Sequence, residues 1–239
     1  MVVLVTGAAG YIGSHVVERL LLQGHAVRAT ARKAASASFL ADFTLGSGAS
    51  LEVVEMDLLN PSSVDAAVNG CTEVIHCAAV LMVGINEVQS DLIDPSVQGT
   101  MNVCHAIEKA GTVNTIIHTS SVAAIRSSTY VNGHVFTAQD WCNDASAEVN
   151  PYGFAKAEGE RVMRRFVEQF EQHKRPRLVT IHPSLVFGPI HHVRHLNGSM
   201  AYMKHFAGRM PFVLNTHLNF VDVRDVAELS LIHISEPTR

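Results

Sequence analysis

Apolar runs and amphipathic stretches alternate along most of the chain. The first run, 2–6, is rich in β-branched residues, which is typical of a strand buried on both faces of a parallel sheet. After a glycine-rich turn, Ile12, Val16 and Leu20 recur at helical spacing, and Gly24 ends that helix. The same reasoning predicts further strands at 25–31, 51–57, 73–79, 114–121 and 177–183.

Helices are expected between these strands. Asn60 followed by proline is a helix start, apolar spacing indicates a helix over about 86–110, and Asn150 opens another helix to about His173. The stretch 34–50 is expected to hold a short helix within a loop. Strands alternating with helices predict an α/β fold, a Rossmann-type doubly wound parallel sheet.

The pattern changes after Pro183. An irregular stretch richer in His, Asn, Gly and Met follows, with a helix expected at 198–208 and a strand at 218–223. We expect a smaller substrate-covering lobe to begin here.

The amino-acid composition excludes several classes of protein. The chain has 239 residues, 47% hydrophobic and 17% charged, with a net charge of -4. This composition excludes a disordered chain, and it has no excess of basic residues that would indicate nucleic-acid binding. The sequence contains no apolar run of the ~20 residues that a membrane span needs. The four cysteines lack C-x-x-C spacing, which predicts buried thiols and a cytoplasmic protein. Nothing in the composition predicts the oligomeric state.

The turn "TGAAGYIGS" (6–14) sits between a strand and a helix and places Gly7, Gly10 and Gly13 three residues apart. Glycines permit a tight turn and let the backbone approach a pyrophosphate, whose charge the helix N-terminus favours. We therefore predict a dinucleotide site here, lined by these glycines with Tyr11 and Ile12.

The residues at the end of the second predicted strand indicate which nicotinamide cofactor, NAD(H) or NADP(H), the chain would bind. Enzymes of this topology that use NAD usually carry an acid there, whereas this chain has Ala31 followed by Arg32 and Lys33. Two cations suit a 2′-phosphate, so we predict NADP(H) rather than NAD(H). Asp57 ends the third strand, where it would lie near adenine or serve as a turn acid.

Tyr152 and Lys156 are four residues apart on one predicted helix, which places them on the same face. A neighbouring ammonium makes a phenolate easier to form, so the pair can donate a proton to a carbonyl oxygen that receives a hydride. The serines of "HTSS" (118–121) follow the fifth strand, at the sheet edge where ligands bind in this topology. A serine hydroxyl there can hydrogen-bond the substrate oxygen.

Together these motifs resemble the extended short-chain dehydrogenase/reductases. The branch that includes dihydroflavonol reductases, cinnamoyl-CoA reductases and yeast-type aldehyde or methylglyoxal reductases is indicated by particular segments. These are "VRATAR" (27–32), "FTAQDW" (136–141), "NPYGFAKAEGE" (150–160), "IHPSLVFGP" (181–189) and "FVDVRDVA" (220–227).

The resemblance implies roles for individual residues. Ser121 would be the catalytic serine, chosen over Ser120 by aligning "HTSS" with the family's F-T-S-S, with Tyr152 as the acid–base and Lys156 as its partner. Arg32 matches the arginine that selects NADP. Asp57 and Leu58 would line adenine, Ala78 and Ala79 would lie along the cofactor, and Pro183 would sit near the nicotinamide. Lys33 departs from the family, which has an acid at that position.

The expected activity is NADP(H)-dependent reduction of an aldehyde or ketone, a small-molecule carbonyl substrate, to an alcohol. The alternatives are a nucleotide-sugar epimerase or dehydratase, a 3β-hydroxysteroid dehydrogenase on the same scaffold, or a non-catalytic NADP-sensing regulator. We expect domains at 1–183, which binds the cofactor, and 184–228, a partial substrate lobe.

Three histidines that lie close together in the sequence are candidate metal ligands: His191, His192 and His195. No acid or cysteine lies within helical reach of them, so no metal is predicted.

The end of the chain does not continue the helix expected after 223. "LSLIHISEPTR" (229–239) introduces β-branched residues and then a proline, and it matches a translated sequencing-library adapter codon for codon. We therefore expect a non-native tail, a natural protein cut near Glu228, and an incomplete C-terminal substrate lobe. The uncovered apolar surface would make this chain aggregation-prone and weakly active.

Overall fold

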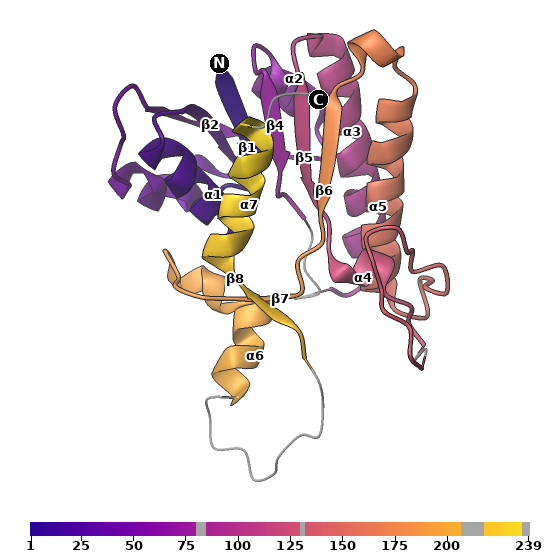
Figure 1. The fold of residues 1–239 in the computed structure, drawn as a ribbon. Helices are drawn as coiled ribbons and strands as arrows, with labels where there is room; N and C mark the ends of the chain where they lie inside the picture. The colour runs from indigo at the N-terminus through magenta and orange to yellow at the C-terminus, as the bar shows by residue number, and fades with distance from the viewer. Residues whose placement is uncertain (80–84, 130–131, 207–217, 236–239) are drawn as a thin grey trace.

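A six-stranded parallel sheet forms the centre of the molecule (Figure 1). The computed structural model describes residues 1–79, 85–129, 132–206 and 218–235. The strand order is β3-β2-β1-β4-β5-β6, and all five pairings are parallel. The strands are β1 (Val2–Thr6), β2 (Ala26–Ala31), β3 (Ser50–Glu55), β4 (Glu73–His76), β5 (Thr115–Thr119) and β6 (Arg177–Ile181). The order reverses between β1 and β4, so the predicted doubly wound fold is confirmed.

Helices cover both faces of the sheet. On one face lie α1 (Tyr11–Leu22), α7 (Val223–Ser235) and the short helix η1 (Ala34–Asp42), and on the other lie α2 (Pro61–Val68), α3 (Asp94–Ala110) and α5 (Pro151–Glu168). A π-helical turn, η2 (Gln89–Ile93), leads into α3, and α4 (Val122–Ile125) precedes α5. No helix in the described part of the chain is both long and apolar enough to cross a bilayer.

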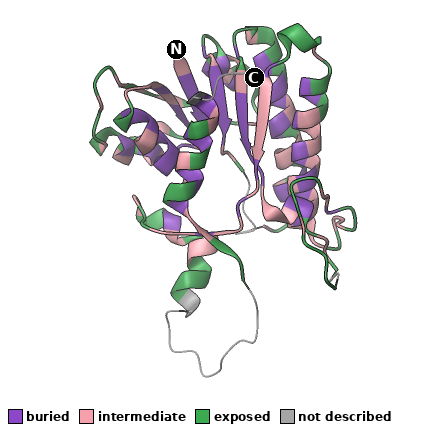
Figure 2. Cartoon of the chain, in the orientation of Figure 1, coloured by how far each residue is buried: buried purple, intermediate pink, exposed green. Residues whose placement is uncertain are grey.

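Two apolar clusters fill the spaces between the sheet and these helices, and the inner faces of the strands are buried (Figure 2). Leu20 of α1 and Met163 of α5 are fully buried between their helices and the sheet. Truncating side chains like these to alanine costs about 2–5 kcal/mol each, so the clusters hold both layers against the sheet.

Local signals set several helix ends. Asn60 accepts a hydrogen bond from the Ser63 amide at 3.4 Å, and Asn150 accepts one from the Gly153 amide at 3.0 Å. Gly111 ends α3 in the left-handed conformation, with φ of 63°.

The helix predicted to reach His173 instead ends at Glu168, followed by η3 (Gln172–Lys174). The Arg175 guanidinium donates to the carbonyls of Glu168 and Phe170, which satisfies the end of the helix and lets the chain turn back toward β6.

The segment after Pro183 contains more regular structure than predicted. β7 (Leu185–Phe187) was expected to be irregular, but it pairs in parallel with β8 (Phe220–Asp222). α6 (Ser199–Phe206) and η4 (Val193–Leu196) lie in the same region, beside the β7–β8 ribbon (Figure 1). The last two residues of the helix predicted at 198–208 lie outside the described residues. The proposed division at 183 stays a prediction.

The prediction that the helix stops near Glu228 is wrong, because α7 continues to Ser235. Val223, Val226, Ala227, Ser230, Leu231 and Ile234 are buried. These positions recur every three or four residues, so one face of the helix is continuous, and α7 packs on α1 and β5. Packing of this face outweighs the weak helical preference of β-branched residues. The end of the predicted tail, 236–239, lies outside the described residues, and its adapter origin stays a prediction.

Candidate active site

The glycine-rich turn lies against the segment that follows β4. Gly7 has φ of 67°, and a Cβ placed on it would lie 2.7 Å from the Ala78 Cα. Gly10 donates its amide to the Gly7 carbonyl at 2.8 Å, and a Cβ on Gly13 would collide with the same carbonyl oxygen. Side chains at Gly7 and Gly13 would therefore open the turn. The first amides of α1 lack intrahelical acceptors, which makes this turn a suitable seat for an anion.

Tyr11 and Ile12 belong to the turn, but their side chains pack against the apolar cluster of Val186, Val223 and Val226. Burial, with a contribution from Asp222, raises the pKa of Tyr11 to about 12. These two residues can therefore contribute backbone amides to a cofactor, while their side chains fasten α1 to β7 and α7.

Arg32 and Lys33 follow β2 and are exposed. Within the described residues neither side chain forms an ion pair, and Glu55 instead accepts from the Ala34 amide at 2.8 Å. Both cations are thus available to an anionic ligand. Arg28 has a different role, because it bonds Glu52 at 2.7 Å and the carbonyls of Ala67 and Asn69.

Asp57 lies just beyond β3. Its carboxylate accepts from the Leu59 amide at 3.0 Å, which is the local turn contact that the sequence left as the alternative to adenine. The Leu58 side chain packs beneath α3, and its carbonyl accepts from Asn102 at 2.7 Å.

Three further predicted cofactor residues follow the ends of the strands. Ala78 donates its amide to the Thr6 hydroxyl at 3.1 Å, and Ala79 is exposed beside it. Pro183 is buried beyond β6, and its carbonyl accepts from the Val122 amide at 3.0 Å. They lie at the carboxyl edge of the sheet, where this topology binds ligands.

Lys156 connects α5 with the end of β5. Its Nζ donates to the Thr119 carbonyl at 3.4 Å, two residues before Ser121. Tyr152 lies one turn earlier on α5, half-buried against the cluster of Leu92 and Ile93.

Ser121 caps α4, and its hydroxyl accepts from the Ala123 amide at 3.2 Å. A Cβ on Gly153 would lie 2.9 Å from the Ala123 carbonyl oxygen, so the first turn of α5 packs closely on α4. Ser120 is buried and faces Glu160, whereas Ser121 is half-buried. The fold therefore brings Ser121 close to the helix that carries Tyr152 and Lys156.

The model of the NAD dependent epimerase/dehydratase family matches residues 3–239. The chain belongs to this family. It is an NAD(P)-dependent oxidoreductase with the extended short-chain dehydrogenase/reductase fold.

Three similar proteins are named as reductases. Tetraketide alpha-pyrone reductase 2 of Arabidopsis thaliana is 33% identical, with 98% of this chain aligned to 74% of its own length. A cinnamoyl-CoA reductase of Medicago truncatula is 31% identical, with 97% of this chain aligned to 71% of its length. A yeast methylglyoxal/isovaleraldehyde reductase, crystallised with NADPH, superposes with a TM-score of 0.85 at 28% identity, covering 99% of this chain and 75% of its own.

Two buried histidines next to Lys156 were missed by the sequence reasoning. His76 and His118 are paired in register on β4 and β5, with ring centroids 5.4 Å apart. Burial, followed by the charge of Lys156, lowers the pKa of His76 to about 4. Burial, then His76 and Lys156, holds the pKa of His118 well below its usual value. β4 ("EVIH") ends on a histidine and β5 ("TIIHT") has one next to its last residue, a signal that aligning the parallel strands could have found.

A second buried group lies on α5. His182 contacts Glu160 at 2.8 Å, and both side chains are almost completely buried. Burial raises the pKa of Glu160, but the facing His182, Ser120 and Arg164 side chains outweigh that effect and lower the pKa to about 2. Glu160 is therefore an anion that ties α5 to the segment leading to Pro183.

Proposed function

We propose that this protein reduces an aldehyde or ketone to an alcohol with NADP(H), using Ser121, Tyr152 and Lys156. The observation that carries the proposal is the hydrogen bond from Lys156 Nζ to the Thr119 carbonyl, two residues before Ser121, because Lys156 follows Tyr152 by one helical turn on α5. The three relatives named above are called reductases, which supports the same class of reaction.

The chain's own residues support a dinucleotide at the carboxyl edge of the sheet. Gly7, Gly10 and Gly13 form a close-packed turn at the start of α1, where the backbone could hold a pyrophosphate. Arg32 and Lys33 are exposed after β2, form no ion pair with the residues that the structure describes, and would bind a 2′-phosphate. The yeast reductase named above was crystallised with NADPH, which supports this preference.

Other residues are proposed to line the rest of the cofactor. Asp57 and Leu58 would border the adenine, Ala78 and Ala79 would border the middle of the molecule, and Pro183 would lie near the nicotinamide. Bound NADPH would supply a hydride to the carbonyl carbon.

In the proposed mechanism, the Ser121 hydroxyl donates a hydrogen bond that orients the substrate carbonyl. The Tyr152 hydroxyl gives its proton to the carbonyl oxygen as the hydride arrives at carbon, so the product is a neutral alcohol. The Lys156 ammonium stabilises the phenolate that remains, and solvent then restores the proton.

The segment 184–228 is proposed to cover the substrate. β7, η4, α6 and β8 lie together at the end of the sheet where the proposed catalytic residues converge (Figure 1). Small carbonyl compounds are the proposed substrate class.

The test is Tyr152→Phe in the full chain, assayed by NADPH consumption with a panel of aldehydes and ketones. We expect turnover to fall by about 10²–10⁴-fold while NADPH still binds, because only the proton donor is removed. Retained turnover would refute the assignment.

Ser121→Ala and Ser120→Ala form a matched pair for the choice of serine. We expect the first to impair turnover and the second to leave most of it. Wild-type NADPH binding without turnover of any carbonyl would favour the regulator, and turnover of nucleotide sugars would favour the epimerase or dehydratase.

A further inference from the structure

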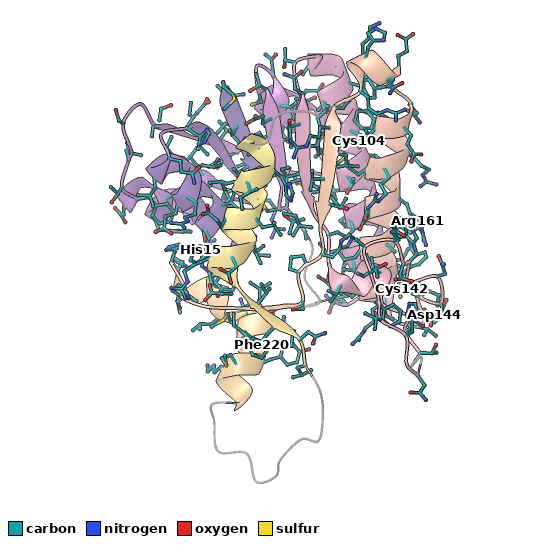
Figure 3. All side chains as sticks on the ribbon, in the orientation of Figure 1. His15, Cys104, Cys142, Asp144, Arg161 and Phe220 are labelled. Atoms are coloured by element: carbon teal, nitrogen blue, oxygen red, sulfur yellow. The ribbon has the colours of Figure 1, made fainter. Side chains whose placement is uncertain are left out.

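Three side chains that are distant in sequence meet beside the first turns of α1. His15 and Glu18 lie on α1, and His191 comes from the segment after β7. His15 is buried and the other two are half-buried. Figure 3 places His15 near the end of the sheet, where the β7–β8 ribbon meets the α1 side. We call these residues the histidine corner.

The three facing atoms have the spacing of ligands on one ion. His191 Nε2 lies 3.1 Å from His15 Nδ1 and 3.4 Å from Glu18 Oε2, and His15 Nδ1 lies 3.8 Å from Glu18 Oε2. A circle through the corners of a triangle with these sides has a radius of about 2.0 Å, which matches Zn–N and Zn–O bonds of roughly 2.0–2.2 Å. A central ion therefore needs no large movement of the ligand atoms.

A backbone contact orients His15 for this role. Its Nε2 lies 3.0 Å from the Pro189 carbonyl oxygen, which can only accept, so Nε2 carries the proton. In the neutral ring Nδ1 then presents its lone pair toward His191 and Glu18. Metal-binding histidines are commonly held this way, with the second nitrogen donating to a carbonyl. His191 Nε2 donates to His15 Nδ1 in the absence of an ion, and on binding one the neutral His191 ring would carry its proton on Nδ1 instead, which frees the Nε2 lone pair.

We propose that the histidine corner is a site for a divalent transition-metal ion, Zn²⁺ in particular, bound by His15 Nδ1, His191 Nε2 and Glu18 Oε2. Two imidazoles and one carboxylate favour zinc over Mg²⁺ or Ca²⁺, which prefer sets of oxygen ligands. A tetrahedral ion would have its fourth position open to water.

The ion would join two parts of the chain. The segment of His191 continues to His195, whose Nε2 contacts the Ala9 carbonyl of the glycine-rich turn at 3.1 Å. A metal bond between α1 and His191 would therefore fix the segment after β7 to the helix that begins at that turn. The role is structural, and it is independent of the proposed reductase activity.

The test is zinc binding by the full, metal-free chain without a histidine tag. Calorimetry with ZnCl₂ should give one equivalent bound, and MgCl₂ should give none. Zinc at about 100 times its dissociation constant should raise the melting temperature by roughly 5–10 °C. A Co²⁺-substituted protein should show the intense visible absorption of a tetrahedral site.

Three variants locate the site. Glu18→Gln and His191→Ala should each weaken zinc binding at least about tenfold, since each removes a ligand. His192→Ala is the matched control, because its imidazole contacts Arg194 instead, and it should bind zinc like the wild type. Circular dichroism would verify that all three fold.

Absence of stoichiometric zinc binding in the folded chain would overturn the proposal. Binding that survives both ligand variants would also overturn it. Each readout is independent of turnover, so failure of the reductase assignment would leave this result intact.

Discussion

Two groups of buried or half-buried histidines lie near the proposed ligand-binding edge of the sheet, and their neighbours differ. His76 and His118 stack beside Lys156, and we refer to these two histidines with the proposed catalytic residues Ser121, Tyr152 and Lys156 as the catalytic corner. In the histidine corner the imidazoles of His15 and His191 face Glu18. Burial lowers the pKa of both His76 and His15 to about 4, so the corners differ in their neighbours: Lys156 lies beside the first pair, whereas Glu18 lies beside the second as a proposed third ligand. Residue type and burial alone therefore do not define the chemistry of a histidine, because the side chain beside it also decides whether it can join a set of metal ligands.

Lys156→Met should give the largest difference between the effects on the two corners. Turnover should fall by about a thousandfold, because the ammonium that supports the Tyr152 phenolate is lost. Zinc affinity measured by calorimetry should remain that of the wild type. A variant that keeps most of its turnover, or loses zinc binding as well, would contradict this division.

Gly7→Ala should damage the turn that both corners adjoin. The added Cβ meets the Ala78 backbone and also forces a non-glycine residue to φ of 67°. We expect the free energy of unfolding to fall by about 3 kcal/mol in urea denaturation. Gly70→Ala is the control, since Gly70 has φ of 75° but open space around its Cβ position, and it should cost only about 1 kcal/mol. Equal losses would show that the contact with Ala78 is unimportant.

Acid should weaken the folded state through the buried histidines of both corners, since burial lowers the pKa of His15 as well as that of His76 to about 4. The pKa of His76 is about 4 in the folded protein, so between about pH 6.5 and pH 4 the unfolded chain binds the proton more tightly. Stability is therefore complete above this window and is lost as the pH falls. His76 alone should lower the free energy of unfolding by about 2 kcal/mol between pH 7.5 and pH 5, measured by chemical denaturation.

His118→Phe sharpens that measurement. Its Nδ1 has no hydrogen-bond partner among the described residues, so phenylalanine can fill the space without losing a bond there. The variant should show a shallower dependence on pH than the wild type. Parallel curves would mean that His118 does not take part in the acid response.

The smallest effect is expected outside both corners, at Arg32. Arg32→Ala should weaken NADPH binding about tenfold, because an exposed charge-assisted contact to the 2′-phosphate is lost. NADH binding, measured by the same fluorescence titration, serves as the control and should not change. An equal loss for both cofactors would place Arg32 elsewhere on the dinucleotide.

Local sequence was sufficient to predict much of the fold and the location of the proposed site residues. β-branched runs, the spacing of Gly7, Gly10 and Gly13, and the caps at Asn60 and Asn150 act over a few residues, and the structure has the corresponding strands, turn and helix starts. The four-residue spacing of Tyr152 and Lys156 likewise survives in α5, because one helical turn brings them to the same face.

Other features were decided only by contacts between distant segments. α7 continues past Glu228 because Leu231 and Ile234 find an apolar surface on the α1 side of the sheet, which no local propensity reveals. The short strand β7 exists because β8 pairs with it. Glu18 supplies the acid that the histidines after β7 lack in sequence, because folding places α1 beside them. Residue spacing predicts local geometry because it acts within one helix, strand or turn. Burial, and contacts between charged side chains on different elements, depend on the tertiary structure.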